Sequence, residues 1–188
     1  MDFSAWWNSC WPTWDWVSAQ LFCAMVALLF AAICRTGQKK DWVQKQYLAA
    51  AVVGVYLILV FMSTVFTRKV SADYRAEWMP FWSYRRVIME QDIGMLAEIV
   101  LNCLMLFPYG LLMPVVLGDE DGRKRNRQIV FIGFLMSAAI ELLQLVLKRG
   151  LFEWDDILHN TLGAAIGCGL YPFLCRWIAA QKSRSEGS

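Results

Sequence analysis

Apolar residues run along the chain in long blocks that short charged stretches separate. A helix needs about 20 apolar residues to cross a bilayer core of ~30 Å, so blocks of that length predict membrane spans. They predict an all-α integral membrane protein, a multi-pass protein of the cell membrane built as a compact bundle of about five transmembrane helices. The blocks lie at residues 16–34, 47–66, 93–117, 129–147 and 157–178.

The spans divide the chain into three parts. Residues 1–46 hold a Trp-rich segment, the first span and an inner loop, residues 47–178 form the main transmembrane domain, and residues 179–188 form a short polar cytoplasmic tail. Lys and Arg are more frequent in 35–46, in 118–128 and in the tail than in the connections on the other side. Because cytoplasmic loops are enriched in Lys and Arg, this bias predicts the N-terminus outside and the C-terminus inside.

Composition narrows the class of protein further. Hydrophobic residues make up 58% of the chain and charged residues 18%, against roughly 45–50% and about 25% in soluble domains. The net charge of +2 is too small to indicate a nucleic-acid surface. The six cysteines form no Cys-x-x-Cys pair, and His159 is the single histidine of the sequence. We therefore expect no metal site and no cofactor.

Polar side chains recur at helical spacing inside three of the spans. A charged side chain at mid-bilayer costs on the order of 2.5–3.5 kcal/mol, so it usually faces a partner or a wet cavity. Offsets of four and three place Ser137, Glu141 and Gln144 on one face of the fourth span. Glu98 and Asn102 are four residues apart in the third span.

The fifth span combines polar residues with small ones. Asp156, Asn160, Gly163 and Gly167 share one helical face. Glycines four residues apart let a neighbouring helix approach closely. The sequence therefore predicts tight helix packing directly beside a polar set.

Pro108 lies near the middle of the third span. Proline has no N–H and its ring clashes with the preceding turn, so the span is expected to kink or unwind there, with Gly110 adding freedom. An ordinary kink and a backbone ligand site, as transporters use, are both compatible with this pattern.

Depth along the helices brings most of these polar residues into the outer half of the bundle. Glu141, Asp155 and Asp156 are candidates for acid–base catalysis, although no motif identifies a catalytic residue. The structural alternative is a network in which Arg149 pairs with Asp155 or Asp156 and the amides satisfy Glu141. The predicted ligand-binding set is Asn102, Ser137, Glu141, Gln144, Arg149, Asp155, Asp156 and Asn160.

Four stretches of the sequence resemble the VanZ-like family of bacterial membrane proteins, over roughly residues 47–178. Leu106 and Phe107 depart from the family pattern, which usually has Phe and an aliphatic residue at these places. Pro80, Pro108, Gly110, Gly163 and Gly167 fall within the matching stretches as expected structural positions. The stretches are Met79–Tyr84, Asn102–Gly110, Ser137–Gln144 and Arg149–Gly167.

The resemblance implies a role at the cell envelope, because the named member of the family is associated with low-level resistance to glycopeptide antibiotics of the teicoplanin type. The leading hypothesis is a membrane protein that binds an outer-leaflet lipid, a lipid-linked wall precursor or a glycopeptide. The alternatives are a membrane enzyme acting on a lipid headgroup, a small lipid or solute transporter, and a helix-packing partner of another envelope protein. The expected partners are the lipid bilayer and one of these ligands, and no nucleic acid is expected.

Overall fold

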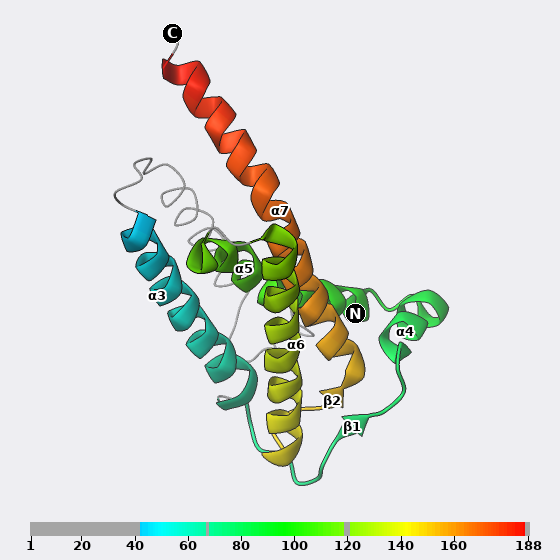
Figure 1. Ribbon diagram of the computed structural model, residues 1–188. Coiled ribbons are helices and arrows are strands. Elements are labelled where there is room, and N and C mark those ends of the chain that lie inside the picture. Colours follow the sequence, from blue (N-terminus) through cyan, green and yellow to red (C-terminus); the bar gives the residue numbers. More distant parts are fainter. Residues whose placement is uncertain (1–41, 67, 119–120, 187–188) are drawn as a thin grey trace.

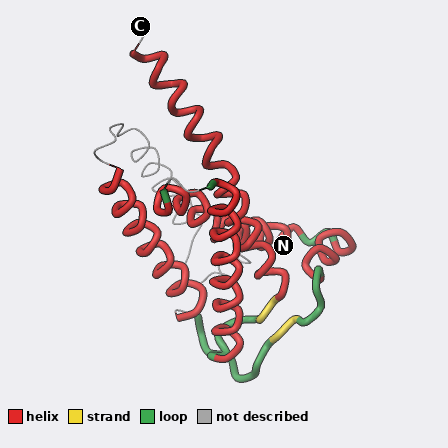
Figure 2. The backbone as a smooth tube through the Cα atoms, viewed as in Figure 1, coloured by secondary structure: helices red, strands yellow, loops and turns green. Residues whose placement is uncertain are grey.

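The computed structural model describes residues 42–66, 68–118 and 121–186 (Figure 1). The predicted span at 16–34 lies outside these residues. Helices dominate the described chain, and the two short strands and most of the loops gather at one end (Figure 2). The four long helices are α3 (Trp42–Phe61), which continues into the π-helical turn η2 (Met62–Phe66), α5 (Ile93–Leu117), α6 (Gly122–Val146) and α7 (Trp154–Glu186).

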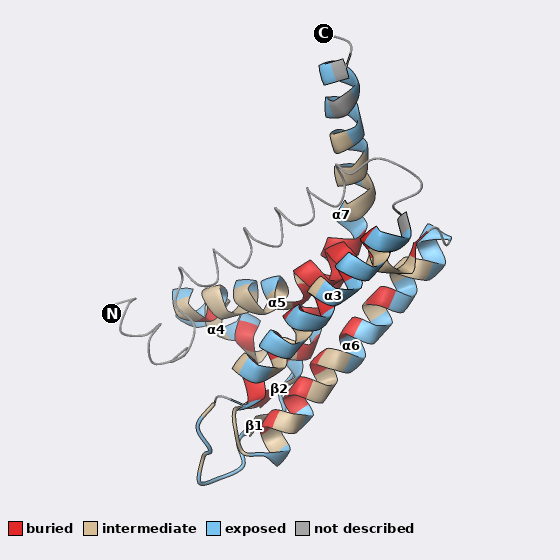
Figure 3. Ribbon diagram, turned by 90° about the vertical axis from the view of Figure 1, so that its left-hand side faces the viewer, coloured by how far each residue is buried: buried red, intermediate tan, exposed pale blue. Residues whose placement is uncertain are grey.

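Within the described residues, four helices are long and apolar enough to cross a membrane, over Val43–Phe66, Ile93–Leu117, Gly122–Val146 and Trp154–Ser185. Exposed residues run along these helices (Figure 3), and many of them are large and apolar. Such surfaces suit lipid, because hydrocarbon takes up apolar surface that water would not. The exposed side chains include Val55, Ile58, Phe131, Leu135, Ile166 and Phe173.

The helices extend beyond three of the predicted apolar blocks, those of α3, α6 and α7. α6 begins at Gly122 rather than at residue 129, since the Asp121 side chain accepts a hydrogen bond of 3.1 Å from the backbone N–H of Arg123 and caps the helix. α7 continues to Glu186, so most of the predicted tail 179–188 is helical. Ala and Gln, both good helix formers, follow the apolar block there. A search for runs of apolar residues detects only the part of such a helix that would cross the membrane, and it misses the polar turns at the ends.

α5 and α7 make the most extensive helix contact of the described structure. A Cβ atom added to Gly163 would lie 1.8 Å from the backbone oxygen of Cys103, and one added to Gly167 would lie 2.3 Å from that of Phe107. At Gly110, on the other helix, an added Cβ would lie 2.1 Å from the backbone oxygen of Ala164. The two backbones therefore touch directly, which only glycine permits.

α5 stays helical through Pro108, so the helix does not unwind at that position. The Tyr56 hydroxyl of α3 donates a hydrogen bond to the backbone oxygen of Met105, one turn before the proline. α3 thus contacts the backbone of α5 where the missing N–H of Pro108 weakens the helical hydrogen bonding.

Two elements in the connections at one end of the bundle were not predicted. β1 (Ala76–Glu77) pairs in parallel with β2 (Phe152–Glu153), and the amphipathic helix α4 (Trp82–Glu90) follows β1. Strands of two residues are too short to show a period of two in the sequence. α4 has nine residues with three charges among them, so it forms no apolar block. Both elements lie where α7 begins (Figure 1).

Gly163→Ala is expected to lower the melting temperature in detergent, because its methyl group must separate α5 from α7. Overpacking of this kind typically costs ~1–3 kcal/mol. Gly169→Ala on the same helix is the matched control, since an added Cβ meets nothing within 4 Å and alanine favours helix over glycine by up to about 1 kcal/mol. Equal melting temperatures for the two variants would contradict the direct backbone contact.

Candidate functional site

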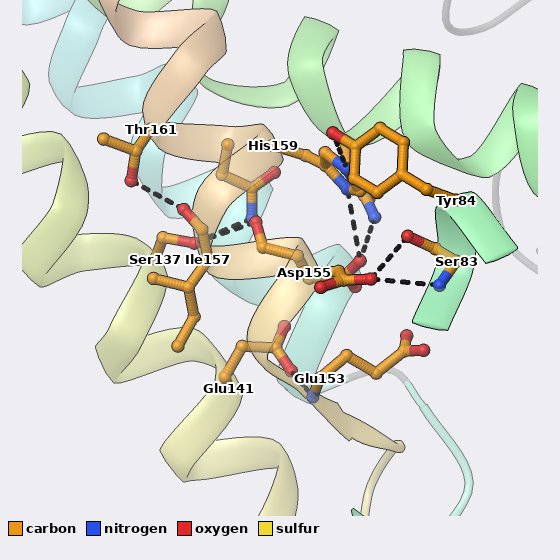
Figure 4. Close-up of polar contacts among 12 residues, drawn as sticks. Ser83, Tyr84, Ser137, Glu141, Glu153, Asp155, Ile157, His159 and Thr161 are labelled. Carbon is orange, nitrogen blue, oxygen red and sulfur yellow. Dashed lines mark hydrogen bonds and ion pairs between the residues drawn. The ribbon is translucent and has the colours of Figure 1, made fainter. Parts of the chain in front are cut away.

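A cluster of polar side chains lies at the end of the bundle where α7 begins (Figure 4). Its members come from α5, α6, α7 and β2, and five of them are almost completely buried. Six of the eight residues that the sequence indicated as ligand-binding belong to it. The polar cluster consists of Asn102, Ser137, Glu141, Glu153, Asp155, Asp156, His159 and Asn160.

Two hydrogen bonds between side chains join the cluster across helices. The Asn102 amide on α5 donates to Oδ1 of Asp156 on α7 at 2.5 Å. The Asn160 amide, one turn further along α7, donates to Oγ of Ser137 on α6 at 2.8 Å. Asp156 and Asn160, one turn apart on α7, thus contact two different neighbouring helices.

Glu141 and Glu153 meet beside this pair. Glu141 is 1% exposed, and its Oε2 accepts a 3.0 Å hydrogen bond from the backbone N–H of Glu153 (Figure 4). Burial raises the pKa of the Glu153 carboxyl, and the negative charges of Asp156, Glu141, Glu98 and Asp155 raise it further. Its protonated form is therefore favoured relative to an exposed glutamate.

Sequence reasoning did not include Glu153 among the site residues. The available signal was the concentration of three acids within four residues, Glu153, Asp155 and Asp156, directly before a membrane span. Such a concentration is costly near a bilayer unless the acids share protons or have partners.

Asp155 has a different set of contacts from its neighbour Asp156. Its carboxylate accepts hydrogen bonds from the backbone N–H of Phe81 at 2.6 Å and from the N–H and hydroxyl of Ser83 at 3.0 and 2.5 Å. Phe81 is the N-cap of α4, has φ 62° and supplies no capping side chain of its own. Asp155 therefore caps α4 from another part of the chain and fixes this helix to the start of α7.

Tyr84 and His159 form a second contact between α4 and α7. The Tyr84 hydroxyl lies 2.9 Å from Nε2 of His159, with the ring centroids 5.3 Å apart. Partial burial raises the pKa of the Tyr84 hydroxyl, and the neighbouring Cys103 and Asp155 raise it further. Nδ1 of His159 lies 4.0 Å from Oδ1 of Asp156, which is too long for a hydrogen bond. The three side chains stand in the order Asp156, His159, Tyr84.

Arg149 does not pair with Asp155 or Asp156 in the described part of the chain. Its Nη1 donates instead to the backbone oxygens of Phe66 and Arg68, the latter at 3.1 Å. The cause is local, since Lys148 has φ 54° and turns the backbone after α6 back toward η2. The predicted ion pair between Arg149 and Asp155 or Asp156 was therefore wrong.

Arg68 is the cation whose charge acts on the cluster, and sequence reasoning did not select it. Its charge interacts with the carboxyls of both Glu141 and Asp156. Gln144 lies near it at the edge of the cluster and donates to the backbone oxygen of Thr64 at 3.3 Å, rather than to Glu141. A Cβ on Gly150 would lie 2.6 Å from Oε1 of Gln144 and 3.1 Å from Nη1 of Arg68.

Two atoms of the cluster are buried without a hydrogen-bond partner among the described residues. They are Oδ1 of Asn160 and Nδ1 of His159, in residues that are 0% and 1% exposed. A buried polar atom left unpaired costs about 1–3 kcal/mol. Over the same described residues, no three His, Cys, Asp or Glu side chains are grouped so as to hold a metal ion.

The described residues thus define a helical protein with four membrane-length helices and a buried, carboxylate-rich polar cluster at one end. The sequence model of the VanZ/LLP1 family matches residues 47–176, and the chain belongs to this family. This match confirms the VanZ-like resemblance, and the whole polar cluster lies inside the matched region. No curated protein and no solved structure matches the chain.

Asp155→Ala is expected to release α4 from α7, because it removes the acceptor of three hydrogen bonds. The loss is about 1–3 kcal/mol of unfolding free energy for polar groups left unpaired. Hydrogen exchange of residues 81–90 measures the release directly and should become faster. Asp73→Ala, in the exposed loop before β1, is the control. Unchanged exchange in α4 would show that Asp155 does not cap it.

Proposed function

We propose that this protein binds the headgroup of an amphiphilic cell-envelope molecule, an outer-leaflet lipid or a lipid-linked wall precursor, at the polar cluster. The observation that carries the proposal is the pair of unpartnered buried atoms, Asn160 Oδ1 and His159 Nδ1, within a set of acids at the start of a membrane-length helix. Polar groups in such a place are costly unless a partner satisfies them. A headgroup that enters the cluster would supply that partner.

The chemistry of the cluster favours a headgroup rich in hydrogen-bond donors. Carboxylate and amide oxygens of Glu141, Asp156 and Asn160 dominate it, and such acceptors bind hydroxyl and amine groups. Arg68 and Arg149 at its edge are suited to a phosphate or carboxylate on the same ligand. A sugar or amine linked to phosphate combines both features.

Aromatic side chains beside the cluster fit an amphiphilic ligand. Phe152 of β2 lies 5.0 Å from the ring of Trp78 and 5.4 Å from that of Trp154, measured between centroids. Trp78 and Trp154 are exposed. Indole rings favour the boundary between headgroups and hydrocarbon, because the ring is apolar and its N–H is polar. The rim they form lies where the glycerol or first isoprene units of a bound lipid would pass.

In this proposal the cluster faces the outside of the cell, as the distribution of Lys and Arg predicts. A protein that holds a wall precursor there would change the precursor's access to glycopeptide antibiotics, which act outside the membrane. We therefore propose that the protein contributes to resistance of the teicoplanin type. Membership of the VanZ/LLP1 family supports this step.

Glu141→Gln is expected to weaken binding of the purified lipid-linked wall precursor by about 10- to 100-fold, because a hydrogen bond to a charged group contributes ~1.5–3 kcal/mol. Its melting temperature should stay close to that of the wild type, since the amide oxygen still accepts from Glu153 and an uncharged group is cheaper to bury. Asp156→Asn should weaken binding in the same way.

The matched control is Asp73→Asn, which removes an exposed acid outside the cluster. Titration of the precursor into protein in nanodiscs gives the affinities, and detergent melting curves give stability. In cells, the same three variants are compared for teicoplanin susceptibility. Full binding and full resistance in Glu141→Gln with unchanged melting would refute the assignment of Glu141.

A second candidate function, an enzyme that acts on a lipid headgroup, rests on the order Asp156, His159, Tyr84. An acid that faces one ring nitrogen of a histidine, with a hydroxyl on the other, is an arrangement used for proton transfer. Incubation of the precursor with purified protein distinguishes the two functions. Product formation that is lost in His159→Gln selects the enzyme, and unchanged precursor selects binding alone.

The orientation is tested with cysteines introduced at Ala72 and Ser183, both exposed and at opposite ends of the described bundle. A membrane-impermeant maleimide added to intact cells should label Ala72→Cys and spare Ser183→Cys. The unmodified protein gives the background from its own cysteines. The reverse labelling pattern would place the polar cluster at the cytoplasmic side and contradict the proposed ligand source.

A further inference from the structure

A second site lies at the end of the bundle away from the polar cluster. α6 and α7 run in opposite directions there and leave a groove of about 1000 Å³ between the first half of α6 and the middle of α7. The floor of the groove is apolar. It is formed by Val130, Phe131, Phe134, Ala165 and Cys168.

The end of the groove is strongly basic. Arg123, Lys124 and Arg127, in the first turns of α6, line it and are exposed. Within residues 42–66, 68–118 and 121–186, no carboxylate forms an ion pair with any of these three side chains. Asn126 also lines the groove, and its buried Oδ1 has no hydrogen-bond partner among those residues.

We infer that this groove is a binding site for an anionic phospholipid, with an acyl chain on the apolar floor and the phosphate at Arg123, Lys124 and Arg127. The three cations directly precede the apolar part of α6, so they lie at the depth of lipid headgroups. The donors of two guanidinium groups and one ammonium match phosphate oxygens. This site is independent of the function proposed for the polar cluster.

Charge complementarity favours a lipid over the other possible occupants. A second copy packed on this face with two-fold symmetry would bring two identical basic ends together. The predicted span at 16–34 is followed by Arg35, Lys39 and Lys40, so it would add further positive charge at this end in the predicted orientation. A phospholipid with a net negative headgroup neutralises the three cations and fills the apolar floor with one molecule.

The test compares binding of phosphatidylglycerol and phosphatidylcholine with identical acyl chains to the delipidated full-length protein by native mass spectrometry. The wild type should prefer phosphatidylglycerol. Arg123→Gln combined with Arg127→Gln should lower the affinity for phosphatidylglycerol roughly 30-fold, since each basic side chain near a surface contributes about fivefold. The control removes two exposed charges elsewhere, in Arg85→Gln combined with Lys69→Gln, and should change little.

A second pair of variants tests the groove itself. Ala165→Phe fills the floor and should abolish the tightly bound phosphatidylglycerol, whereas Ala179→Phe, on the exposed surface of α7, should not. If the charge variants weaken binding and Ala165→Phe does not, the attraction is that of a basic surface and the groove site is refuted. Equal affinity of the wild type for both lipids refutes it as well.

The occupant is identified in the membrane with a photo-crosslinking residue in place of Phe131, in the full-length protein. Recovery of a phospholipid adduct supports the inference. Recovery of a peptide from residues 1–41, or of a crosslinked second copy, would show that protein covers the groove and would overturn it.

Discussion

The direct contact between the backbones of α5 and α7 is the constraint on which the rest of the described structure depends. Gly163 and Gly167 bring α7 so close to α5 that an added Cβ would lie within 2.3 Å of a backbone oxygen at either position. This approach places Asn102 in hydrogen-bond distance of Asp156, two turns before Gly163. The geometry of the polar cluster therefore depends on the close packing of α5 and α7 at glycine, and not only on the polar side chains themselves.

The adjacent acids Asp155 and Asp156 at the start of α7 have different roles. Successive residues of a helix point about 100° apart, so Asp155 and Asp156 face different neighbours. Asp155 accepts three hydrogen bonds from the start of α4, while Asp156 faces Asn102 and His159. Asp155 is thus a positioning residue that holds Tyr84 against His159, and the chemistry proposed for the cluster is that of Asp156 and Glu141.

Much of the bundle could be predicted from sequence, because spans are local features. The block at 93–117 coincides with α5, and the spacing of Ser137, Glu141 and Gln144 correctly places all three on one buried face. Long-range contacts could not be predicted in this way. β1–β2 pairing involves strands of two residues, and Arg68 reaches the acids only because the chain folds back after η2. Arg149 does not pair with the acids of the polar cluster, because the backbone of Lys148 is in the left-handed conformation and turns Arg149 toward the backbone oxygen of Arg68.

The energetics of the polar cluster support the proposed ligand. Unpaired buried atoms such as Asn160 Oδ1 and His159 Nδ1 cost about 1–3 kcal/mol each. Domains are stable by only ~5–15 kcal/mol, so this cost is a sizeable fraction of the total. Apolar side chains of the same size would pack α5, α6 and α7 without it, as replacement of buried ionic groups often shows. In the proposed function, a ligand that donates to Asn160 Oδ1 would supply this hydrogen bond, and the gain would form part of its binding free energy.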